Sequence, residues 1–172
     1  SLTITDNGWL ASGDWRDNEG TLSLSLPSVA AGQTATLADM DSVSGSFALS
    51  ASGDQIFVVD NGEAVAGLHT GGGWSDATDS STSALPPGLE DASITFAETP
   101  DALCYDGIRS GTTAELRDAL TDSSQWTECS ALDASPFFVS DAAGGLNGTS
   151  TAALTSVAAA GVFGAAAVVA MW

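Results

Sequence analysis

Basic residues are almost absent from this chain of 172 residues, which has no lysine and only three arginines, Arg16, Arg109 and Arg117. It carries 22 aspartates and glutamates, and its formal net charge is −19. Proteins hold nucleic-acid phosphates with lysine and arginine, so the composition argues against a nucleic-acid partner. An anionic lipid surface would also repel the acidic part of the chain. The charge favours solubility, and it would suit a cationic protein partner, divalent cations or a salty environment.

Histidine and cysteine are also scarce. The single histidine, His69, and the two cysteines, Cys104 and Cys129, are too few for a four-ligand structural zinc site. The cysteines are either one disulfide or two buried thiols, and export would favour the disulfide. Such a bond would close a loop of about 25 residues and stabilise the fold by roughly 3 kcal/mol.

Motifs of catalysis and cofactor binding are missing as well. No serine lies in a nucleophile-elbow sequence, and we interpret His69, within a glycine-rich segment, as a surface histidine. The run Gly71-Gly72-Gly73 lacks the spacing and the lysine of a phosphate-binding loop. The sequence therefore predicts no catalytic residues and no cofactor.

The C-terminal segment 150–172 contains no charged residue. As a helix it would be long enough to cross about 30 Å of hydrocarbon. The small residues Ala160, Gly161, Gly164 and Ala165 lie about one turn apart, which would allow a neighbouring helix to approach closely. We therefore predict a single transmembrane helix over 150–172.

A glycolipid-attachment signal is the alternative interpretation of this region. Small residues at 141–145, a short polar spacer and a terminal apolar tail form such a signal, whose tail is removed from the mature protein. The sequence Asn147-Gly148-Thr149 is also a glycosylation sequon, which matters only in a glycosylating compartment.

The rest of the chain shows the pattern of short strands separated by turns. Alternating or continuous apolar runs predict strands at 2–5, 21–26, 33–38, 45–49, 55–60, 63–68 and 93–97. Residues 132–139 are expected to form a last strand or a docking segment. Asn61-Gly62 predicts a tight hairpin, and Thr112-Thr113-Ala114-Glu115 predicts a capping box that opens a helix ending near 120. We expect an antiparallel β-sandwich domain with one short helix at 1–139, a flexible stalk at 140–149 and the membrane helix.

Hard oxygen ligands gather in one short stretch, at Asp14, Asp17, Asn18 and Glu19. They form a weak calcium candidate, because oxygen-rich loops bind this ion but the EF-hand spacing is absent. Aspartate and asparagine are also the ordinary residues of turns, and we favour that interpretation.

Five segments in order resemble an exported family of lamin-tail, immunoglobulin-like β-sandwich domains found in secreted bacterial and algal proteins. The segments are TDNGW at 5–9, WRDNEGT at 15–21, VAAGQTATL at 29–37, FALSASGDQIFVV at 47–59 and SALPPGL at 83–89. The resemblance covers about residues 3–126. It implies a non-enzymatic domain used for attachment or assembly. It also implies that Trp9 and Trp15 pack at a corner of the sandwich while Arg16 pairs with Glu19 or a neighbouring aspartate.

We therefore expect a membrane-anchored structural or accessory subunit with its acidic domain on the exported side, in the thylakoid lumen or outside the cell. The C-terminal helix and the acidic domain would contact other subunits of a membrane complex. The algal members of the family make a photosystem with its antenna a plausible host. A surface adhesion or recognition module, anchored by a span or a glycolipid, is the alternative. An acidic-carboxylate hydrolase is a third hypothesis, although no carboxylate pair stands out.

Overall fold

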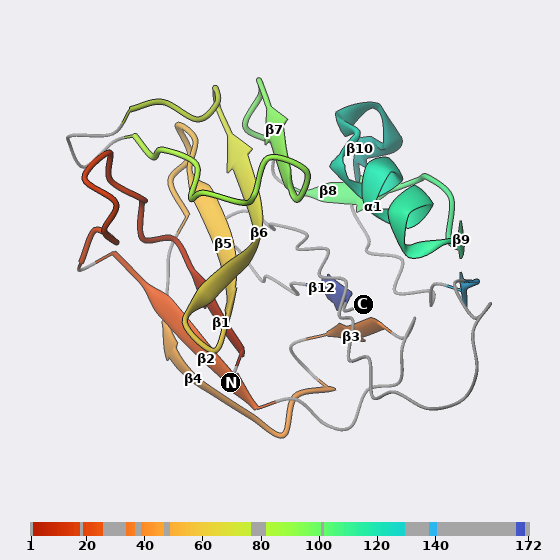
Figure 1. The fold of residues 1–172 in the computed structure, drawn as a ribbon, viewed down its shortest axis with the longest axis horizontal. Coiled ribbons are helices and arrows are strands. Elements are labelled where there is room, and N and C mark those ends of the chain that lie inside the picture. Colours follow the sequence, from red (N-terminus) through yellow and green to blue (C-terminus); the bar gives the residue numbers. More distant parts are fainter. Residues whose placement is uncertain are drawn as a thin grey trace.

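The protein is mainly β in the computed structural model (Figure 1). The structure describes residues 2–17, 19–25, 34–36, 39–46, 49–76, 82–100, 102–129, 138–140 and 168–170. The predicted mainly-β class with one short helix is therefore confirmed over this part of the chain.

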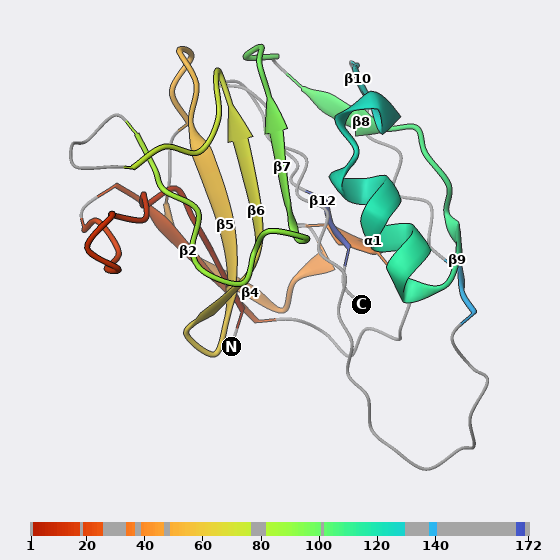
Figure 2. The ribbon, with the colours of Figure 1, turned by 45° about the horizontal axis from the view of Figure 1, so that its top comes forward.

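Six strands form the main sheet in the order β4-β2-β1-β5-β6-β7 (Figures 1 and 2). Their bounds are β1 Leu2–Thr5, β2 Thr21–Ser25, β4 Ser42–Ser46, β5 Gln55–Asp60, β6 Glu63–Thr70 and β7 Ser93–Phe96. Four of the five pairings are antiparallel, as predicted, but β7 runs parallel to β6. The long connection over 71–92 allows this exception, because it returns the chain to the starting end of β6 before β7 begins.

The hairpin between β5 and β6 turns at Asn61 and Gly62, as the sequence predicts. Both residues have positive φ, 49° for Asn61 and 92° for Gly62. Asparagine and glycine tolerate this left-handed conformation best, and the turn matches the twist of the strands that it joins.

One strand prediction is displaced. The sequence predicts a strand at 45–49, whereas β4 occupies Ser42–Ser46 and so begins three residues earlier; residues 47 and 48 lie outside the described residues. Its register explains the shift, because Ser42 pairs with Ser25 and Ser46 pairs with Thr21 along the whole of β2. Backbone pairing with β2 thus sets where β4 begins.

Among the described residues, three two-stranded sheets accompany the main sheet, and the third, β12 with β3, is described below. β8 (Leu103–Tyr105) pairs with β10 (Trp126–Glu128), and β9 (Ser110–Gly111) pairs in parallel with β11 (Phe138–Val139). The sequence analysis missed β8, β9 and β10, which are too short to show a period. Of the expected strand or docking segment at 132–139, only the last two residues are described.

The predicted membrane helix falls mostly outside the described residues, as do Ala160, Gly161, Gly164, Ala165 and, except for Ser140, the stalk. The three described residues of this region depart from the prediction. They form β12 (Val168–Ala170), an extended strand that pairs antiparallel with β3 (Thr34–Thr36). Over the described ranges, no helix has the length and apolar character required to cross a bilayer.

The helix α1 (Thr113–Thr121) begins with the predicted capping box. The Thr112 side chain accepts a hydrogen bond from the Glu115 backbone N–H, and the Glu115 carboxylate accepts one from the Thr112 N–H. Both bonds satisfy donors that a helix start otherwise leaves unpaired. Leu116 and Leu120 are buried, so the predicted apolar face is confirmed. The short helix η2 (Ser123–Gln125) follows.

The main core lies between one face of the sheet and a cover made of α1, β8 and β10 (Figure 2). Its buried residues come from both layers: Leu2, Ile4, Leu22, Leu24, Ile56, Val58, Leu68, Ile94 and Phe96 from the sheet, and Leu103, Tyr105, Leu116, Leu120 and Trp126 from the cover. Trp126 ties the cover together, because its Nε1 donates to the Leu120 carbonyl at 3.0 Å.

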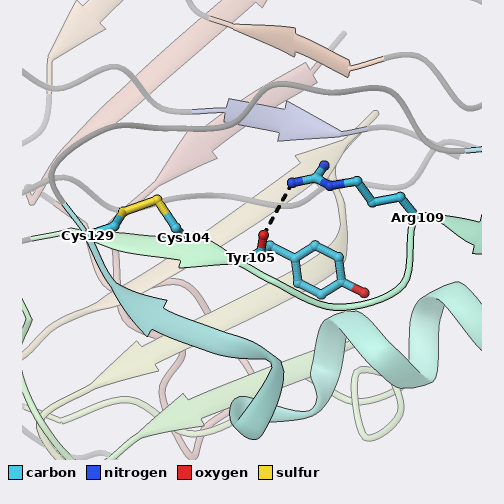
Figure 3. The surroundings of a disulfide bond; sticks show 4 residues. All are labelled: Cys104, Tyr105, Arg109 and Cys129. Atoms are coloured by element: carbon cyan, nitrogen blue, oxygen red, sulfur yellow. Dashed lines mark hydrogen bonds between the residues drawn. A yellow bond between two sulfur atoms is a disulfide. The ribbon is translucent and has the colours of Figure 1, made fainter.

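Cys104 and Cys129 form a disulfide beside the β8–β10 pair (Figure 3). Their Cα atoms are 5.8 Å apart. Next to it, Arg109 donates to the Tyr105 carbonyl at 3.2 Å, and its guanidinium lies 5.5 Å from the Tyr105 ring centroid. The disulfide closes the loop that contains α1, and so it holds α1, β8 and β10 together.

Replacing both cysteines by serine should lower the free energy of unfolding by about 3 kcal/mol, because the open loop gains entropy in the unfolded chain. Urea unfolding followed by tryptophan fluorescence would measure the change. Wild-type protein treated with a reductant should lose a similar amount. An unchanged midpoint in both experiments would mean that the disulfide does not hold the cover.

Candidate functional site

Residues 6–20 contain arginine, carboxylate, amide and tryptophan side chains. They cover the face of the sheet opposite the main core. In β5, Ile56 and Val58 belong to that core, so Phe57 between them projects to the other face. Phe57 is fully buried there. The second face is therefore covered as well, by residues 6–20 and by the connection after β6.

A chain of aromatic rings forms this second cover. The ring centroids are 4.9 Å apart for Trp9 and Trp15, 5.2 Å for Trp15 and Phe57, and 5.2 Å for Phe57 and Trp74. His69 then meets Trp74 edge-on at 5.1 Å. Such contacts add stabilisation beyond the area that they bury. The expected packing of Trp9 and Trp15 thus takes the form of a layer on the central strand.

Gly67 makes room for this layer. A Cβ atom at this position would lie 3.2 Å from Cε1 of Phe57 and 3.3 Å from Trp74. Gly67 also pairs with Phe57 across the β5–β6 ladder. A side chain at this position would press on both rings, which would have to shift by a few tenths of an ångström.

Arg16 fastens the cover. Its guanidinium donates to the Glu19 carboxylate at 2.8 Å and to the Thr82 carbonyl at 2.8 Å. Glu19 also accepts from the Gly8 N–H at 2.9 Å, and the Asn7 side chain accepts from the Glu19 N–H at 3.0 Å. The expected Arg16–Glu19 pair is confirmed, and it connects residues 6–20 with the segment near 82.

Ser83 completes the connection between these two segments. It is fully buried, and its Oγ accepts from the Trp9 N–H and donates to the Ala84 carbonyl, both at 2.9 Å. Trp9 and Ala84 also form a β-bridge. This serine hydroxyl is therefore occupied in holding the backbone.

Gln55, Asp54 and Asp6 place polar groups next to the aromatic layer. Gln55 is 3% exposed, and its Nε2 donates to the Asp6 carbonyl and to the Asp54 carboxylate. Burial raises the pKa of Asp54, although backbone donors from Ser50 and Gln55 oppose the shift. The Asp54 carboxylate is a hydrogen-bond acceptor directly before β5.

His69 lies inside this cover, so its assignment as a surface histidine is wrong. It is 8% exposed in β6 and pairs in register with Gln55. Burial lowers the pKa of His69 below the usual 6.5, and a hydrogen bond with the Thr70 backbone, which favours the protonated ring, partly opposes this shift. Among the described residues, neither His69 Nδ1 nor Trp74 Nε1 has a hydrogen-bond partner. The neutral ring acts here as an aromatic packing element.

The structure describes three of the four residues of the calcium candidate. Glu19 binds Arg16, Asn18 lies outside the described residues, and Asp14 and Asp17 are exposed. Within the described segments, no group of three or more histidine, cysteine, aspartate or glutamate side chains is placed to hold a metal ion.

The sequence analysis did not join Gln55, His69 and Trp74. The hairpin at Asn61-Gly62 was an available signal, because its register carries Gln55 to within one residue of His69. The β-bulge between Val58 and Val59 shifts the register by that one residue, and the sequence does not reveal the bulge.

Comparison with known protein families, curated proteins and solved structures finds no match for this chain.

Arg16→Ala should lower the free energy of unfolding by about 2 kcal/mol, because it removes charge-assisted hydrogen bonds to Glu19 and Thr82. Thermal or urea unfolding would measure this. Arg117→Ala is the matched control, since Arg117 lies exposed on α1 and its loss should change stability by less than about 0.5 kcal/mol. Equal effects of the two substitutions would contradict the assignment.

Stability should fall as the pH drops below 6.5 because of His69. The unfolded chain takes up a proton there, whereas the folded protein resists protonation until its lowered pKa is reached. His69→Gln should remove this dependence, and His69 is the only histidine in the chain. Urea unfolding at several pH values should show the two proteins converging or crossing as the pH falls. Asp54 is common to both and cancels in the comparison. A constant difference between them across this range would refute the prediction.

Proposed function

We propose that this chain is a non-enzymatic structural or accessory subunit of a larger membrane complex. Its acidic β domain lies on the exported side of the membrane, and the uncharged segment 150–172 anchors it as a single span. In that arrangement Val168–Ala170 leave their pairing with β3 and enter the membrane. We assign the domain to the exported lamin-tail, immunoglobulin-like sandwich type on the five sequence segments that resemble that family.

The proposal rests on the contacts that the side chains of residues 6–20 make in the structure. Trp9 and Trp15 pack on the central strand, and Arg16 and Glu19 bind each other and the neighbouring backbone. The side chains best suited to chemistry in this stretch are thus engaged in covering the sheet. This supports a role in assembly over a role in catalysis.

Charge supports a protein partner. The exposed surface carries most of an excess of 19 negative charges, which would attract a cationic subunit and speed its association. The uncharged segment 150–172 and its small residues at 160–165 support helix packing inside a membrane complex. An algal photosystem with its antenna is the host that we propose, with the acidic domain in the thylakoid lumen.

Intact-mass measurement of the protein from native membranes, combined with a native gel after mild detergent extraction, tests this assignment. We expect a mass that includes Trp172 and migration with a large complex whose subunits can be identified. A protein that ends near Gly144, carries a glycolipid and migrates alone would refute the proposal in favour of a surface module.

A further inference from the structure

Strand β4 is the outer strand on one side of the main sheet (Figure 1). It pairs with β2, and all five of its residues are exposed. Among the described residues, no strand pairs with its other side. Half of its backbone N–H and C=O groups therefore face outward, where they can form a further ladder.

Within Ser42–Ser46 the edge lacks charge and proline, two of the usual protections against strand addition. Natural edge strands carry lysine, other charges or proline, whereas Ser42–Ser46 reads SVSGS and contains none of these. Its irregular residue is Gly45, with φ of 97°. A Cβ there would collide with the Thr21 carbonyl, so this distortion fits β4 against β2. The stretch from Ser42 to Ser44 is left regular.

The two faces of β4 differ in chemistry. Ser42, Ser44 and Ser46 share one face, because they pair with Ser25, Ser23 and Thr21 on β2. Val43 lies on the other face and is 44% exposed. An incoming strand would thus meet hydroxyls on one face and an apolar side chain on the other.

Charge selects the occupant of this edge. A second copy would bring another net charge of −19 to the interface and be repelled, whereas a segment rich in lysine or arginine would be attracted. We propose that β4 is a docking edge for an extended basic segment of a partner protein, which adds to the sheet as one more antiparallel strand. This rests on the proposed assembly role and specifies its surface and its partner.

Binding of a synthetic peptide of alternating lysine and valine to the full chain in mild detergent would test the edge. Fluorescence anisotropy gives the affinity, and hydrogen exchange reports protection of β4. A peptide with the same side chains but N-methylated at alternate residues should bind at least about tenfold more weakly, because it cannot complete the ladder. The glutamate–valine counterpart should not bind. Equal binding of the N-methylated peptide would reduce the interaction to charge alone and overturn the proposal.

Two exposed valines provide a matched pair of variants. Val43→Lys should weaken peptide binding about tenfold by like-charge repulsion at the edge. Val65→Lys on β6, where the valine is 42% exposed, adds the same charge away from β4 and should weaken it far less. Ser44→Lys is a second edge variant if Val43→Lys unfolds. Equal losses at positions 43 and 65 would overturn the docking edge. The assembly role would survive that result if the chain still migrated with a large complex.

Discussion

Burial of both faces of strand β5 is the constraint on which the structure depends. Ile56 and Val58 pack into the main core, and Phe57 between them is fully buried on the opposite face. A strand with large apolar side chains on both faces is stable only when two layers exclude water from it. The first layer is regular structure, built from α1 and the β8–β10 pair. The second consists of connecting segments.

A cover made of connecting segments buries backbone polar groups, which costs free energy unless they are hydrogen-bonded. Its backbone groups lose water without gaining a regular ladder, so other partners must satisfy them. Arg16 supplies a bond to the Thr82 carbonyl, Ser83 bonds the Trp9 N–H, and Gln55 bonds the Asp6 carbonyl. This explains why arginine, carboxylates and tryptophans crowd into residues 6–20. The same composition that resembles a reactive site is what an irregular layer over an apolar strand requires.

The distribution of charge bears on the assembly role that we propose. The net charge of −19 opposes compaction and self-association. The disulfide between Cys104 and Cys129 favours the folded state, because it lowers the conformational entropy of the unfolded chain. Strand β4 contains no charged residue although it lies at an open edge of the sheet. In the docking that we propose, the acidic surface attracts a basic partner over a distance, and the neutral edge of β4 pairs with its backbone.

Local physics made several elements predictable from the sequence. The alternation in Thr21–Ser25, the positive-φ pair Asn61-Gly62 and the reciprocal bonds of Thr112 and Glu115 depend on near neighbours, so the chain encodes β2, the β5–β6 turn and the start of α1 directly. The pairing of Arg16 with Glu19 is similarly local. The parallel addition of β7, the displacement of β4 and the burial of His69 were decided by tertiary structure. Each depends on which distant strand or cover is adjacent, and the energy of backbone pairing and burial there exceeds the local preference of the residues.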